Sequence, residues 1–68
     1  MADSKLTPRE IRVLELLADG YEYQEMGRLL SIQGDTIKKM VAYRILSKLG
    51  ADNKTQAVAM ALRRGLIQ

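Results

Sequence analysis

Hydrophobic positions recur every three or four residues in four separate segments of the chain, which is typical of helices that pack through one face. The first segment opens with Thr7-Pro8-Arg9-Glu10, a capping box with proline at the first helical position. Apolar residues follow at positions 11, 13, 14, 16, 17 and 18, and Gly20 is a natural stop. The pattern therefore predicts a scaffold helix over about residues 8–18.

A second helix is predicted over about residues 22–30. Tyr23, Met26 and Leu30 form one apolar stripe. Gly27 lies on this stripe, where glycine costs about 1 kcal/mol relative to alanine. We expect that it marks a close approach to the backbone of the third helix. Residues 31–34 form the turn, and Ile32 closes the core.

The third predicted helix spans about residues 35–48 and ends at Gly50. Its basic residues are Lys38, Lys39, Arg44 and Lys48. Because glutamine is a poor N-cap, we expect Gly34 or Asp35 rather than Gln33 to cap it. A basic helix that follows a tight turn in a small helical chain is typical of the reading element of a helix-turn-helix that binds duplex DNA.

A fourth helix is predicted over about residues 54–64, and Gly65 closes it. Its start, Asn53 to Gln56, resembles a capping box. The helical period places four residues on the inner arc: Ala57, Val58, Ala61 and Leu62. It places Ala59, Met60 and Arg63 outside, as a candidate homodimer interface or as incidental surface residues. Leu66 and Ile67 add a last apolar contact. The predicted fold is a compact all-α, four-helix domain over residues 6–68, after a flexible tail at 1–5.

Composition narrows the chemistry. The 68 residues form one domain, and they contain no cysteine and no histidine. Disulfides, thiolate metal sites and histidine general bases are therefore excluded. No residue constellation suggests an enzyme, a cofactor or a metal site. There is no signal peptide and no apolar run of about 20 residues that could span a bilayer, so we expect no membrane partner and a cytoplasmic location.

The net charge of +3 is unevenly distributed. Residues 1–34 carry four basic and six acidic side chains, whereas residues 35–68 carry seven basic and two acidic side chains. A domain with one acidic and one basic half presents an oriented field to a polyanion. The alternative is that these charges only solvate helix surfaces.

Taken together, these motifs resemble the LuxR-type helix-turn-helix, also called FixJ/NarL-type. The resemblance rests on L-T-P-R-E at 6–10, V-L-x-L-L-A-x-G at 13–20, Glu25, Leu30, Ile32, T-I-K at 36–38, K-L-G at 48–50 and Q-A-V at 56–58. It implies a bacterial transcription factor domain, on the nucleoid when bound, that docks its third helix in the major groove and often dimerises through its fourth. Because the chain starts at Met1, we favour a stand-alone regulator over an excised domain.

The same resemblance implies that Lys38 contacts base edges or phosphate, and that Tyr23, Gln24, Thr36 and Lys48 contact the DNA backbone. On a straight helix with Ile37 and Val41 inward, Lys39 and Tyr43 point most directly outward. The predicted DNA-binding residues are thus Tyr23, Gln24, Thr36, Lys38, Lys39, Tyr43 and Lys48.

Three features depart from the family pattern. Met40 stands where a histidine is common in the middle of the third helix. Glu22 and Gln33 stand where serine or threonine caps are usual, which should weaken each helix start by about 1 kcal/mol. The distance from Thr36 to the K-L-G at 48–50 is also one residue longer than the family pattern. Core positions Ile37, Val41, Ile45 and Leu49 are consequently four residues apart, and a straight α-helix would rotate them by about 120° in total. We therefore predict a π-bulge or local unwinding between Val41 and Ile45.

An alternative function is a protein-interaction module. If Met40, Tyr43 and Leu46 were exposed together, they would form an apolar patch that is typical of a protein partner site. DNA recognition would then be weak or lost. Salt dependence separates the two, because contacts with phosphates weaken steeply as salt rises.

Overall fold

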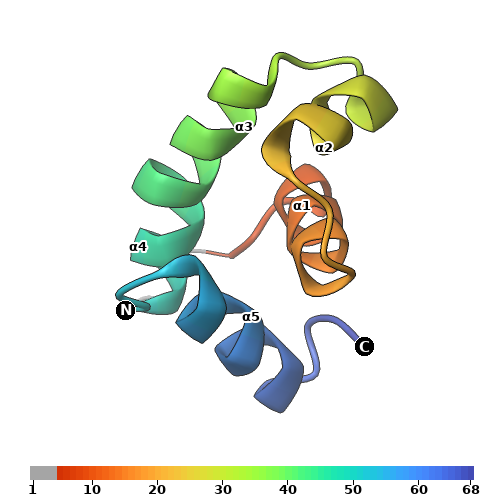
Figure 1. The fold of residues 1–68 in the computed structure, drawn as a ribbon. Coiled ribbons are helices and arrows are strands. Elements are labelled where there is room, and N and C mark those ends of the chain that lie inside the picture. Colours follow the sequence, from red (N-terminus) through yellow and green to blue (C-terminus); the bar gives the residue numbers. More distant parts are fainter. Residues whose placement is uncertain (1–4) are drawn as a thin grey trace.

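The computed structural model describes residues 5–68, and the prediction of an all-α, four-helix fold is confirmed (Figure 1). The first two helices are α1 (Pro8–Ala18) and α2 (Tyr23–Leu30), and the last is α5 (Lys54–Arg63). Between them runs one long third helix, residues 34–49. It consists of α3 (Gly34–Met40), a π turn (Val41–Ile45) and α4 (Leu46–Leu49). Most of the predicted flexible tail, residues 1–4, lies outside the described residues.

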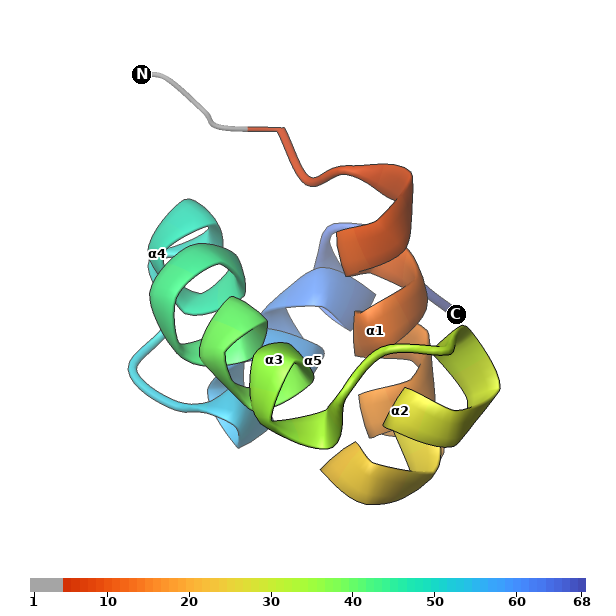
Figure 2. The same ribbon diagram turned by 90° about the horizontal axis from the view of Figure 1, so that it is seen from above.

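The third helix occupies one side of the molecule, α1 and α2 occupy the other, and α5 crosses the lower end (Figure 1). Seen from above, α5 passes below the space between the third helix and α1 (Figure 2). All four helices contribute to one core. Its buried apolar residues are Val13, Leu14, Leu16, Met26, Ile37, Val41, Ile45, Leu49, Ala57, Ala61 and Ile67. Burial of Ile67 confirms half of the predicted last contact after α5, whereas Leu66, predicted to join it, is 39% exposed.

The predicted capping box of α1 is present. The Thr7 hydroxyl accepts from the Glu10 amide at 3.1 Å, and the Thr7 amide donates to Glu10 Oε1 at 2.9 Å. At α5, Asn53 Oδ1 accepts from the Gln56 amide at 2.8 Å, as the sequence suggests. The Gln56 side chain, however, accepts from the Asp52 amide rather than from that of Asn53. The start of α5 is therefore bonded to its preceding loop.

Two predictions about helix ends and faces are wrong. The third helix begins at Gly34, so Gln33 is its N-cap, without a side-chain bond to the helix. Leu62, predicted on the inner arc of α5, is 46% exposed. The core-facing strip of α5 is narrow because it consists of the alanines Ala57 and Ala61, one turn apart. Leu62 lies about 100° beyond Ala61 and falls outside this strip.

Candidate nucleic-acid interface

The turn between α2 and the third helix is held by two facing glycines. A Cβ on Gly27 would overlap the carbonyl oxygen of Ile32 and lie 3.0 Å from the Gly34 amide nitrogen. A Cβ on Gly34 would lie 3.0 Å from the carbonyl oxygen of Tyr23. The predicted close approach at Gly27 is confirmed. Because the two backbones touch here, the start of the third helix has a fixed position relative to α2.

The predicted irregularity in the third helix is also confirmed. Residues 41–45 form a π turn, which the Leu46 amide closes by donating to the Val41 carbonyl, five residues back. Ile37, Val41, Ile45 and Leu49 are all buried, with at most 3% exposure. The wide turn thus keeps four core residues on one side of the helix although they are four residues apart.

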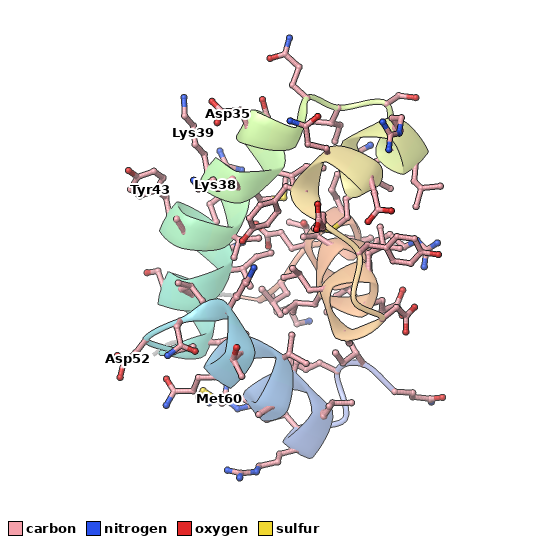
Figure 3. All side chains as sticks on the ribbon, in the orientation of Figure 1. Asp35, Lys38, Lys39, Tyr43, Asp52 and Met60 are labelled. Atoms are coloured by element: carbon pink, nitrogen blue, oxygen red, sulfur yellow. The ribbon has the colours of Figure 1, made fainter. Side chains whose placement is uncertain are left out.

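Within residues 5–68, no other element covers the opposite side of the third helix. Asp35, Lys39 and Tyr43 project along its outer face (Figure 3). Tyr43 is 78% exposed, and Lys39 Nζ lies 3.9 Å from Asp35 Oδ2 in an ion pair in which both side chains are exposed. Thr36 and Lys38 are exposed as well. The predicted contacts Thr36, Lys38, Lys39 and Tyr43 are therefore brought together on one accessible surface.

The protein-interaction alternative requires Met40, Tyr43 and Leu46 to be exposed together. The structure shows a smaller apolar patch than that. Met40 and Leu46 are only partly exposed, and both pack against the hydrophobic core. Tyr43 is thus the one large, highly exposed apolar side chain of residues 34–49. The outer face of this helix is mainly polar and basic.

Lys48 does not lie on that outer face. Its ammonium donates to Glu10 Oε1 at 2.8 Å and to the Lys5 carbonyl at 3.3 Å. The Glu10 side chain is 3% exposed and that of Lys48 is 22% exposed. Burial raises the pKa of the Glu10 carboxyl. The hydrogen bonds from Lys48 and from the Thr7 amide, together with the positive charge of Lys48, outweigh the effect of burial, so the pKa of Glu10 is lowered. The contact of Lys48 with DNA stays a prediction. In this structure the Lys48 ammonium is already paired with the Glu10 carboxylate.

Tyr23 and Gln24 open α2 beside the turn. They line a hollow shared with the start of α5, where the Lys54 ammonium lies 5.0 Å from the centre of the Tyr23 ring. A cation over an aromatic face is attracted by the ring quadrupole. Lys54 was not among the predicted site residues. Nothing in the spacing of Tyr23 and Lys54 along the chain signals that the two helix starts meet.

The predicted dimer residues lie on α5, apart from this surface. Ala59 and Met60 are half-buried, whereas Arg63 is exposed. Glu25 has a local structural role, since its Oε1 accepts from the Glu22 amide at 2.9 Å and thereby bonds the start of α2.

Membrane spans and metal clusters are both absent from residues 5–68. No helix there is long and apolar enough to cross a membrane. Nor does any group of three or more acidic side chains in this part of the chain gather as it would around a metal ion.

Comparison with known proteins identifies the family. The family described as "Bacterial regulatory proteins, luxR family" matches residues 4–61. The chain belongs to the luxR family. This is a family of regulatory proteins and not a class of enzymes.

Several curated luxR-type relatives are similar over most of this chain. The response regulator protein VraR of Staphylococcus aureus is 44% identical over 93% of the chain, which is 30% of VraR. The transcriptional regulatory protein DegU of Brevibacillus brevis is 38% identical over 93%, which is 26% of DegU. YxjL of Bacillus subtilis, an uncharacterized transcriptional regulatory protein, is 39% identical over 91% of the chain. The chain thus spans less than a third of the length of these relatives.

Among solved structures, a similar fold occurs in VqmA of Vibrio cholera, crystallised as a complex with a ligand and DNA. Its TM-score is 0.83 and its sequence identity 38%, over 97% of this chain and 28% of the VqmA chain. At this identity the likeness extends beyond the general arrangement of four helices.

Proposed function

We propose that this chain is a sequence-specific DNA-binding unit of a transcriptional regulator, acting in the bacterial cytoplasm on the nucleoid. The observation that carries the proposal is the third helix, which buries one face completely and exposes Lys39 and Tyr43 on the opposite face. The major groove of duplex DNA is about 12 Å wide and admits an α-helix. Insertion of residues 34–49 would present this free face to base edges.

The side chains on this face have complementary chemistry. Lys38 and Lys39 are suited to donate to guanine O6 and N7 or to phosphate, and Tyr43 to contact a base edge or phosphate. Thr36, together with Tyr23 and Gln24 at the start of α2, would contact the backbone. Lys48 would have to leave Glu10 to reach DNA. Since this set has no Arg, Asn or Gln at its centre, phosphate contacts should supply much of the affinity.

The comparisons support the same proposal. Relatives such as DegU are named transcriptional regulatory proteins, and VqmA has been crystallised with DNA. A family likeness by itself gives function only by analogy. The exposed basic face and the fixed turn before it are the independent, structural support.

We further propose that the DNA-bound form is a homodimer that pairs through α5. Ala59, Met60 and Arg63 would meet across a two-fold axis, which suits an operator with two half-sites. Sedimentation of the free chain and of its complex with a palindromic duplex tests this. A monomer in both states would contradict it.

The DNA proposal is tested by measuring binding to a labelled duplex at several salt concentrations. Affinity should fall steeply as salt rises, and Lys39→Ala should weaken specific binding by about 1–3 kcal/mol. Arg12→Ala is a suitable control, because Arg12 lies on α1 next to the C-terminal residues. Unchanged binding by both Lys39→Ala and Lys38→Ala would show that the docking helix is misassigned.

A protein-interaction module is the second candidate, and the 78% exposure of Tyr43 is the observation that favours it. In that case a regulator would bind the outer face of the third helix. Such an apolar contact should change little with salt, in contrast to contacts with phosphates.

A further inference from the structure

The π turn has no evident benefit for the core. Ala42, Tyr43 and Arg44, which lie between the buried Val41 and Ile45, are all exposed. If the chain had one residue fewer here, the core positions would be four, three and four residues apart. Those eleven residues make about three full turns of a regular α-helix, so all four side chains would still face inward. The extra residue therefore adds nothing to burial.

The extra residue instead changes the direction of side chains on the outer face of the third helix. In a regular α-helix, residues four apart are rotated by about 40° relative to each other. A π turn holds more residues per turn, so Tyr43 stays almost in line with Lys39, as Ile45 stays in line with Val41. In Figure 3, Asp35, Lys39 and Tyr43 follow one another down the outer side of the helix. Without the extra residue, Tyr43 would follow Lys39 by three positions and point about 60° away.

We propose that the π turn is a specificity element, which aligns Tyr43 with Lys39 so that both reach base edges in the same groove. This inference rests on the proposed DNA binding. Four helical residues span about 6 Å, and base pairs are about 3.4 Å apart, so Tyr43 would read a base pair about two steps from that contacted by Lys39. The Lys39 ammonium lies 3.9 Å from Asp35 Oδ2 at one end of this row.

The direct test deletes Ala42, which restores the four, three, four spacing of the core without removing any charge. The wild-type chain and the deletion variant are each used to select bound sequences from random duplexes at one stated salt concentration. We expect the deletion variant to keep its helix content and the salt dependence of its nonspecific binding. Its preference at the base pair assigned to Tyr43 should fall or shift by about tenfold.

A point variant keeps the proposal testable if the deletion does not fold. Tyr43→Ala changes no core residue and should lose the preference at that same base pair, while the preference assigned to Lys39 is kept. Arg12→Ala, on α1 and outside the third helix, is the control. Comparing the selected sequences then maps Tyr43 to one base pair.

The outcomes separate this inference from the function on which it rests. If the wild-type chain shows no salt-dependent DNA binding, the proposed function itself fails. If the wild-type chain binds and both variants select the wild-type sequence with unchanged affinity, the inference alone is overturned. A folded deletion variant with unaltered preference would overturn it as well, because the π turn would then have no part in reading bases.

Discussion

The ion pair between Glu10 and Lys48 joins the first helix to the end of the third, and replacing its carboxylate tests what it contributes. Glu10→Gln keeps the size of the side chain and its ability to accept from the Thr7 amide, which lies 2.9 Å from Oε1. It removes the negative charge next to the Lys48 ammonium, 2.8 Å away. The variant therefore changes the charge of the pair and little else.

The expected loss follows from burial. Hydrogen bonds to charged groups contribute about 1.5–3 kcal/mol, and a bond between two charged groups is stronger than one in which only the Lys48 donor is charged. Part of this difference is offset, because a neutral amide costs less to bury than a carboxylate that is 3% exposed. We expect Glu10→Gln to lower the free energy of unfolding by about 1–2 kcal/mol at pH 7. For a domain of this size the melting temperature should fall by about 4–16 °C.

The pH dependence provides a second readout. Because the pKa of Glu10 is lowered in the folded chain, its contribution to stability is present above the unfolded pKa of about 4.3. The contribution is lost as the pH falls through the lowered folded pKa. Thermal melts of the wild type and of Glu10→Gln should consequently begin to converge as the pH falls through the unfolded pKa and should coincide below the lowered folded pKa, since the protonated wild type also lacks the charge.

Glu15→Gln is the matched control. Glu15 pairs with Arg12 at 3.3 Å on the same helix, but the two side chains are 41% and 56% exposed. Such surface pairs contribute about 0–1 kcal/mol. An equal loss in both variants, or a loss at Glu10 that stays constant down to pH 3, would refute the electrostatic explanation.

Three further changes test the helix starts and the glycine contact by urea denaturation. Gly27→Ala should destabilise the fold by about 1–3 kcal/mol, because its Cβ would overlap the Ile32 carbonyl; a neutral result would disprove the close contact. Gln33→Ser should stabilise it by about 0.5–1 kcal/mol by adding the missing cap of the third helix, and no gain would show that the cap geometry is unsuitable. Asn53→Ala should cost about 1 kcal/mol through loss of the 2.8 Å bond from the Gln56 amide, and an unchanged midpoint would argue against that bond.

Features set by neighbours in the sequence could be predicted well. The capping box at Thr7 and the stop at Gly20 depend on residues within one turn, and both are found where the sequence puts them. The π turn was also predictable, because the spacing of Ile37, Val41, Ile45 and Leu49 conflicts with a regular helix unless the helix widens. Each of these inferences required only local geometry and the assumption of a buried face.

Features set by contacts between distant segments could not be predicted. The basic character of Lys48 suggested a DNA contact, but its partner, Glu10, is 38 residues away in the chain. The hollow where Lys54 lies over Tyr23 likewise depends on how α5 packs against α2. Leu62 was wrongly predicted to face the core. The width of the buried strip of α5 depends on the size of Ala57 and Ala61 and on how closely the neighbouring helices approach α5. Helical period gives the direction of a side chain and not the extent of the surface that covers it.

Three contacts together fix the third helix in space. The paired glycines at positions 27 and 34 hold the start of the third helix against α2. The buried row from Ile37 to Leu49 sets the rotation of the helix about its axis. The ion pair of Lys48 with Glu10 holds the end of the helix against α1. None of the three uses a residue from the exposed row of Lys39 and Tyr43. The residues that hold the helix and those that would read DNA are therefore largely separate, so substitutions on the outer face should alter binding without loss of the fold. A reading helix held in this way is pre-organised, and DNA binding need not order it.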